Sequence, residues 1–97
     1  MKQVEFHPQA QRELEQSVNF YNRRVPGLGD EFLDLVVAAT KRIQSDPLRC
    51  PLRPHGIRRM ILDRFPFSVV YKDEPSRIWI VAFAHGARKP GYWSARL

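Results

Sequence analysis

The sequence feature that most constrains the fold is the run from Arg77 to His85, the longest apolar, β-branched and aromatic stretch in the chain. Apolar residues occupy nearly every position of this run, not only alternate ones. That pattern predicts a strand covered on both faces, as in the middle of a small sheet. Beyond it the chain becomes basic and aromatic, with a turn signal at Pro90-Gly91. We expect this strand to deliver the side chains that follow it to one edge of the molecule. The plainer alternative is a buried strand followed by a capped tail.

The remaining elements follow from apolar periodicity and from turn residues. Apolar residues recur at three- and four-residue steps in two stretches separated by Pro26-Gly27, which predicts two helices packed as antiparallel neighbours. Glu13 belongs to the polar side of the first helix. The expected elements are a half-exposed edge strand at 3–7, helices at 8–25 and from Leu28–Asp30 to Asp46, a proline-rich loop at 47–56, and strands at 57–62, 67–72 and 77–85.

This order, β-α-α-β-β-β with a basic tail, predicts the α+β class. The helical hairpin would pack on a mostly antiparallel sheet, and residues 1–97 would form one domain. The apolar stripes of the two helices would supply much of the core.

Several functional classes are excluded or disfavoured by composition. The single cysteine, Cys50, excludes an internal disulfide and a cysteine metal cluster. His7 and His55 are expected in edge or loop positions, and nothing pairs them with His85 as metal ligands. We therefore expect no metal and no cofactor. No apolar stretch approaches the roughly 20 residues that a bilayer span needs, and the N-terminus has no signal-peptide core. The expected location is cytoplasmic, without a membrane partner.

Charge is distributed unevenly along the chain, whose net formal charge is +6. Residues 1–48 carry six basic and seven acidic side chains, whereas residues 49–97 carry ten basic and three acidic ones. Twelve of the sixteen basic residues are arginine, whose planar fork suits phosphate and carboxylate groups. The second half is thus expected to face nucleic acid, an acidic protein segment or a nucleic-acid-bound machine. A solvated basic face is the alternative.

Short motifs spread over nearly the whole chain resemble those of a known superfamily. They are Phe6-His7-Pro8 with Ala10, Phe20-Tyr21, the segment Pro26–Phe32, Ile57-Arg58-Arg59, Arg64-Phe65-Pro66-Phe67 with Val70-Tyr71, and the terminal His85-Gly86, Arg88, Pro90 and Tyr92-Trp93. In this order they resemble the RelE/ParE superfamily of bacterial type II toxins, in its ParE-like, plasmid-stabilisation branch. The resemblance implies a RelE/ParE-like fold and a small toxin held inactive by a cognate antitoxin. An acidic, amphipathic segment of that antitoxin would wrap it.

The superfamily is divided between two targets. RelE-like members cut mRNA on the ribosome, whereas ParE-like members poison DNA gyrase without cutting nucleic acid. For cleavage, His85 could act as acid or base, Arg64 and Arg88 could hold the phosphate, and Tyr92 could donate a proton or stack on a base. RelE-like nucleases carry a lysine pair on the strand after the helices. Here that strand has Arg58-Arg59, and arginine is too basic to serve readily as a general base.

The sequence therefore predicts a ParE-like toxin that contacts DNA gyrase through its basic face and lacks intrinsic catalysis. Expected contact residues are Arg88, Lys89, Tyr92 and Trp93, supported by Arg58, Arg59 and Arg64. The alternative is a ribosome-dependent mRNA interferase that uses His85, Arg88, Arg64 and Tyr92. A third hypothesis is a degenerate toxin that only binds its antitoxin.

Individual side chains also have plainer interpretations. His85 could cap the strand end by bonding to backbone, and Trp79 and Trp93 could be core and tail packing. Arg58 and Arg64 could pair with Asp63, Asp73 or Glu74.

Overall fold

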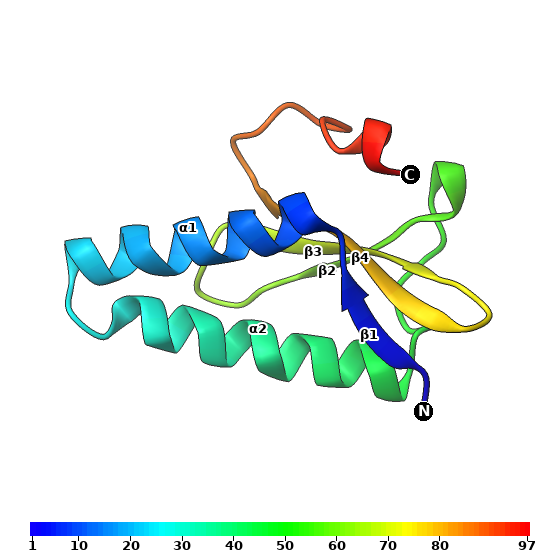
Figure 1. Cartoon of the computed structure of the whole chain (residues 1–97), viewed down its shortest axis with the longest axis horizontal. Coiled ribbons are helices and arrows are strands. Elements are labelled where there is room, and N and C mark those ends of the chain that lie inside the picture. Colours follow the sequence, from blue (N-terminus) through cyan, green and yellow to red (C-terminus); the bar gives the residue numbers. More distant parts are fainter.

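Two antiparallel helices lie against one face of a four-stranded sheet in the computed structural model, which describes residues 1–97 (Figure 1). The order confirms the predicted α+β fold. The elements are β1 (Gln3–Phe6), α1 (Pro8–Arg24), α2 (Leu28–Ser45), a 3₁₀ turn η1 (Pro54–Gly56), β2 (Arg58–Ile61), β3 (Phe67–Asp73), β4 (Arg77–His85) and a second 3₁₀ turn η2 (Ser94–Arg96). Neither long helix has the length and apolar content required to cross a membrane.

The sheet has the strand order β1-β4-β3-β2 and is mostly antiparallel, as predicted. The one parallel pair joins β1 to β4, and its register runs from Gln3 opposite Arg77 to Phe6 opposite Ile80. The other two pairs are antiparallel. β4 is therefore an interior strand, with β3 along its full length and β1 beside only its first half.

A bulge in β4 interrupts the alternation of its side chains between the two faces of the sheet. Tyr71 of β3 lies opposite Ile80, but the preceding residue, Val70, lies opposite Ala82, so Val81 has no partner. Ile80 packs in the main core with the helices, whereas Val81 and Ala82 both join a second apolar cluster. That cluster is on the other face of the sheet. The bulge thus places two consecutive apolar residues on one face.

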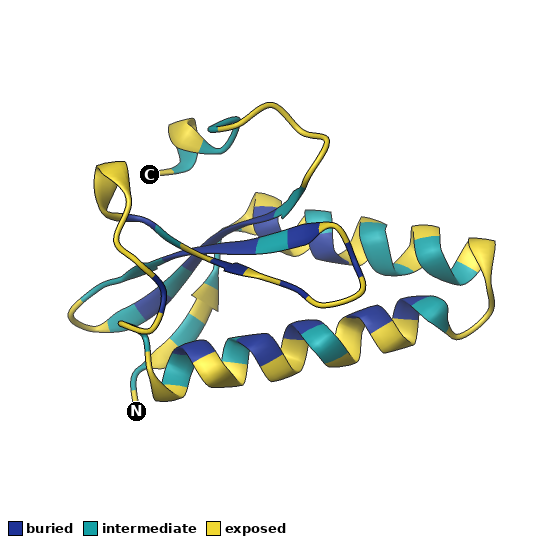
Figure 2. Ribbon diagram, turned by 180° about the vertical axis from the view of Figure 1, so that it is seen from behind, coloured by how far each residue is buried: buried dark blue, intermediate teal, exposed yellow.

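Local sequence features determine where each helix begins. At the N-terminus of α1, His7 Nδ1 accepts a hydrogen bond from the Gln9 backbone N–H at 3.0 Å, and Pro8 occupies the first helical position. Gly27, with φ of 89°, precedes α2, whose first turn carries two acidic side chains. Each helix turns one buried stripe toward the sheet and exposes its other sides (Figure 2).

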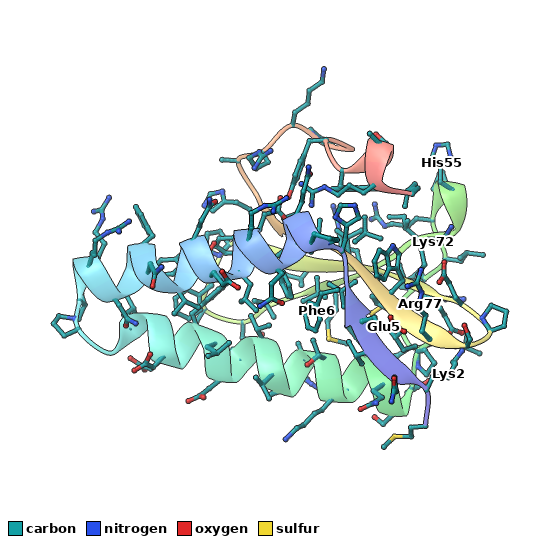
Figure 3. All side chains as sticks on the ribbon, in the orientation of Figure 1. Lys2, Glu5, Phe6, His55, Lys72 and Arg77 are labelled. Atoms are coloured by element: carbon teal, nitrogen blue, oxygen red, sulfur yellow. The ribbon has the colours of Figure 1, made fainter.

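Ion pairs tie the edge strand β1 to the β3–β4 hairpin. Arg77 pairs with Glu74 at 2.7 Å and with Glu5 of β1 at 3.6 Å. Lys2 pairs with Asp73 and donates to the backbone carbonyl of Glu74 at 2.9 Å. Figure 3 shows Lys2, Glu5 and Arg77 beside β1 and the start of β4. The ion pairs occupy Asp73 and Glu74, two of the three carboxylates predicted as possible partners of Arg58 and Arg64.

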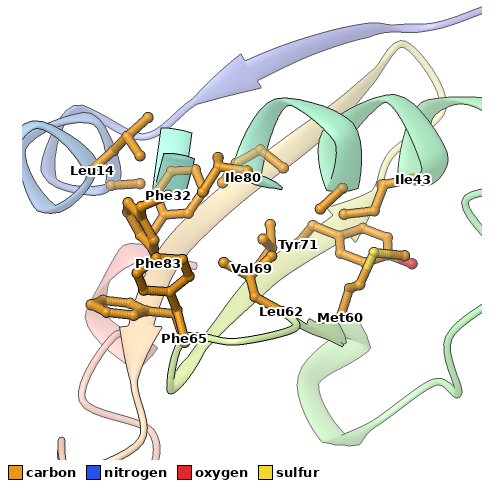
Figure 4. Packing of buried hydrophobic residues seen from close by; sticks show 14 of the residues in the cluster. Leu14, Phe32, Ile43, Met60, Leu62, Phe65, Val69, Tyr71, Ile80 and Phe83 are labelled. Carbon is orange, nitrogen blue, oxygen red and sulfur yellow. The ribbon is translucent and has the colours of Figure 1, made fainter. Parts of the chain in front are cut away.

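The main core lies between the helices and the sheet, and Phe32, which is fully buried, packs near its Leu14 end (Figure 4). The Phe32 ring lies 5.4 Å from Tyr21, 5.1 Å from Phe65 and 5.0 Å from Phe67, measured between ring centroids. Offset and edge-on aromatic packing of this kind adds to the hydrophobic stabilisation. It joins both helices to the turn between β2 and β3.

Candidate functional site

A groove of about 400 Å³ lies where β4 ends, and part of its lining belongs to the second apolar cluster or packs against it. The C-terminal segment, residues 86–93, forms one wall, and the η1 turn contributes to the opposite side. Four cationic side chains and two histidines line this basic groove, and no carboxylate does: Arg53, Arg59, Arg88, Lys89, His55 and His85. Such a surface suits an anionic partner because none of its charges is neutralised within the groove.

A second groove of about 510 Å³ lies between α1 and the ends of β3 and β4. Phe20, Tyr21, Phe67 and Phe83 supply its apolar surface. We call it the aromatic groove. Its polar lining consists of Glu13, Gln16, Ser17, Arg23, His85 and Arg88. His85 and Arg88 belong to both grooves, so they separate an apolar site from a basic one. A ligand with adjoining apolar and acidic parts could occupy both.

His85 ends β4 in the manner expected of a strand cap. Its Nδ1 accepts a hydrogen bond from the Ala87 backbone N–H at 2.9 Å, and its ring packs edge-on against Phe67 at 5.0 Å. These contacts orient the imidazole and use its Nδ1 lone pair. Only Nε2 is left to engage a ligand.

The side chain of Tyr92 is engaged in contacts within the protein. Its hydroxyl donates to Glu13 Oε2 at 2.8 Å, and the guanidinium of Arg88 lies 3.8 Å from its ring centroid. Burial, followed by the hydrogen bond to Glu13, raises the pKa of Tyr92 above its ordinary value. The hydroxyl therefore stays protonated and occupied near neutral pH, and Arg88 covers one face of the ring. These contacts make Tyr92 an anchor of the C-terminal segment.

Arg58 and Arg64 lie outside the basic groove, although the sequence grouped them with His85 and Arg88. Arg58 Nη1 donates to the backbone carbonyl of Cys50 at 2.6 Å. Arg64 follows β2 in the turn before β3, and its Nη2 pairs with Glu31 of α2 at 3.2 Å. The carboxylate partner of Arg64 is thus none of the three predicted. The neighbouring residue Arg59 is exposed on the opposite side of β2 from Met60 and does line the basic groove.

Sequence reasoning missed four contributors to this region: Arg53, His55, Glu13 and Arg96. His55 has a φ of 67° within η1 and projects at the edge of the groove (Figure 3). Its left-handed backbone is uncommon for a non-glycine residue and has no sequence signature here. Glu13 does have a signal, since it immediately precedes Leu14 of the buried stripe and so borders the packed side of α1. Arg96 has none.

The two tryptophans are packing residues, in agreement with their plainer interpretation. Trp79 and Trp93 both lie against the second apolar cluster. Arg77 covers the Trp79 ring at 3.9 Å. Trp93 also lines the basic groove, so it is available there in part. No group of three or more His, Cys, Asp or Glu side chains is arranged to hold a metal ion.

Comparison with known proteins identifies the family. The model of the ParE toxin of the type II toxin–antitoxin system parDE matches residues 4–90. The chain belongs to the ParE toxin family. The ParE match includes Arg59, Arg88 and Lys89, and it ends before Tyr92 and Arg96.

A solved structure described as the chromosomal ParDE TA system from P. aeruginosa has the same ParE fold, with a TM-score of 0.76. It shares 21% sequence identity, and the match covers 88% of this chain and 96% of that one. A search of curated proteins gave no match.

Proposed function

We propose that this ParE family member is the toxin of a type II toxin–antitoxin pair and inhibits bacterial growth by poisoning DNA gyrase. A cognate antitoxin with an acidic, amphipathic segment neutralises it. The observation that carries the proposal is the basic groove, in which four cations lie together without a carboxylate. A surface of this kind favours contact with a polyanion or with a protein bound to one.

Gyrase poisoning is favoured over RNA cleavage because the basic groove lacks a second free group for proton transfer. General acid–base cleavage requires two groups that exchange protons at the reacting phosphate. Tyr92 is protonated and bound to Glu13, and Arg64 is paired with Glu31 away from the groove. Tyr92 lines the groove with His85, but its hydroxyl is already bonded, so His85 is the one expected proton-transfer residue left to engage a phosphate. Arginine cannot readily take the second role. The arrangement supports binding better than it supports metal-free catalysis.

Neutralisation is supported by the pairing of the two grooves. The aromatic groove provides apolar surface from Phe20 and Tyr21, and the adjoining basic groove provides unpaired cations. An amphipathic segment could place apolar side chains in the first groove and carboxylates in the second. Such a segment would cover Arg88, which both grooves share, and so would block the proposed target contact.

The test is a supercoiling reaction with purified toxin, gyrase, plasmid and ATP, stopped with detergent and protease. A gyrase poison traps the cleaved DNA complex, so linear plasmid should accumulate with toxin concentration. It should be absent when gyrase is omitted and reduced for Arg59→Ala. A known gyrase poison serves as the positive control.

The alternatives give different products. Cut mRNA in a translating extract, without linear plasmid, would establish an interferase and overturn the proposal. If neither product forms and expression without antitoxin leaves growth unchanged, the chain is a degenerate toxin.

A further inference from the structure

Glu13 of α1 accepts more side-chain hydrogen bonds than any other carboxylate in the molecule, and its side chain is only 14% exposed. Its Oε1 accepts hydrogen bonds from the Phe83 backbone N–H at 3.1 Å and from Arg96 Nη1 at 3.0 Å. Its Oε2 accepts from the Tyr92 hydroxyl at 2.8 Å and from Arg96 Nη2 at 2.9 Å. One carboxylate therefore joins α1, β4 and the C-terminal segment.

These contacts occur where β4 has lost its strand neighbour. The β1 ladder ends at Ile80, and the chain then leaves the sheet to begin α1. Beyond that point the Phe83 N–H is bonded by Glu13, and the Val81 carbonyl accepts from Arg96 Nη1 at 3.1 Å. Backbone groups at a partly buried sheet edge need partners. Here two side chains supply the acceptor and the donor that a strand would otherwise supply.

The same pair fixes a wall of the basic groove. Tyr92 and Arg96 hold the C-terminal segment against α1 and β4, and Arg88 stacks on Tyr92 at 3.8 Å. The segment between β4 and Tyr92 carries Arg88 and Lys89 into the groove. Its position is therefore set from both ends, by β4 and by Glu13.

We infer that Glu13 and Arg96 act together as a substitute for a strand at the open edge of β4, and that Glu13 is the positioning residue for Arg88 and Lys89 in the basic groove. The effect on growth inhibition rests on the proposed function. The structural part does not, because it concerns only how the C-terminal segment is held.

The central variant is Glu13→Gln, which keeps one carbonyl acceptor but turns the other oxygen into an N–H₂ group that faces Arg96. Tryptic cleavage between Arg88 and Lys89 should accelerate at least several-fold, and hydrogen exchange at the Phe83 amide should rise about tenfold. Glu5→Gln is the matched control, since Glu5 is also ion-paired but lies on β1. It should change neither rate.

A charge reversal separates a strand substitute from an ordinary ion pair. The double variant Glu13→Arg, Arg96→Glu restores opposite charges but replaces the acceptor that faces the Phe83 N–H by a donor, and the donor that faces the Val81 carbonyl by an acceptor. The segment should stay loose in this variant. Full recovery of wild-type proteolysis and exchange would overturn the inference, because a simple ion pair would then be enough.

Two further results keep the inference testable if a variant fails to fold. In the wild-type protein the Phe83 amide should exchange as slowly as amides paired between β3 and β4, and fast exchange there would refute the substitute role.

In cells, Glu13→Gln should weaken growth inhibition as Arg88→Ala does. Full inhibition by Glu13→Gln, with its segment demonstrably loosened and Arg88→Ala impaired, would reject the positioning role alone. Full inhibition by Arg88→Ala would count instead against the proposed function.

Discussion

Arg88 borders both grooves and is exposed, so under the proposed function a target and an antitoxin would compete for it. We predict that Arg88→Ala relieves growth inhibition while lowering stability by less than about 1 kcal/mol. The small cost reflects a stacking contact with Tyr92 at an exposed site. Growth after induction without antitoxin, together with thermal unfolding of the purified variant, measures both effects.

Arg12→Ala is the matched control for this prediction. Arg12 is an exposed arginine of α1 that lines neither groove, so its loss should leave growth inhibition intact. Unfolding of the Arg88 variant at ordinary temperature would show that Arg88 is structural.

At the residue scale, the sequence predicted which residues β4 and its immediate continuation contribute to the lining of the basic groove. These residues were predictable because His85 ends a strand with a clear sequence pattern and Arg88 and Lys89 follow it closely. Arg58 and Arg64 were misplaced for two separate reasons. A strand turns alternate residues to opposite faces, so Arg58 and Arg59 could not both reach one groove. The position of Arg64 depends on a turn whose partner, Glu31, is distant in sequence.

The elements themselves were predicted within a few residues, because apolar periodicity and proline or glycine punctuation are local signals. The bulge at Val81 and the early end of the β1 ladder were not predictable, since both arise from pairing between distant strands. The role inferred for Glu13 follows from the second of these features. A polar residue on α1 becomes essential only when the strand beside it lacks a neighbour.

The helical hairpin depends on a close approach that only glycine permits. A Cβ added at Gly29 would lie 2.1 Å from the Val18 carbonyl oxygen of α1, and the Gly29 N–H already donates to Asn22 Oδ1 at 2.7 Å. We predict that Gly29→Ala lowers the free energy of unfolding by about 1–3 kcal/mol through overpacking. A decrease of about 4–8 °C in Tm per kcal/mol is expected for a domain of this size.

Gly86→Ala is the comparison for this prediction, because its added Cβ would lie 3.5 Å from the nearest atom, the Pro66 carbonyl oxygen. Thermal unfolding should show little change for that variant. Equal losses for the two glycines would mean that the α1–α2 distance adjusts freely and that Gly29 has no special role.

For the whole molecule, the division of charge along the sequence has a spatial counterpart. All four cations of the basic groove come from the second half of the chain, whose acidic residues are few and partly engaged elsewhere. The affinity of the antitoxin complex should therefore fall as salt rises, because the Debye length shortens from about 10 Å at about 0.1 M to about 3 Å at about 1 M. Over this range we expect Kd to rise about tenfold, which corresponds to about 1.4 kcal/mol of binding free energy. Titration calorimetry at several salt concentrations measures this. A constant Kd would indicate an interface dominated by the aromatic groove.

The ionisation of the tyrosines can be used to follow unfolding of the whole molecule, since the chain has three and they lie in different parts of the fold. Burial is the main cause that raises the pKa of Tyr21, Tyr71 and Tyr92 above the ordinary value of 10.0. Because the unfolded chain loses these protons first, the stabilisation is present below that pH and is lost as the pH rises above it. Ultraviolet titration should show little tyrosinate in the native protein at pH 10.0, followed by cooperative ionisation as the protein unfolds.

The variant Tyr92→Phe separates the contribution of the C-terminal segment from that of the core. It removes the hydroxyl bound to Glu13 but keeps the ring, whereas Tyr71→Phe removes a fully buried hydroxyl that donates to the Pro47 carbonyl at 2.9 Å. Each variant should lose stability less steeply with alkaline pH than the wild type, because one raised pKa no longer contributes. If Tyr92 instead ionised at its ordinary pH while circular dichroism remained native, the C-terminal segment would open independently of the core, and the basic groove would lack a fixed wall.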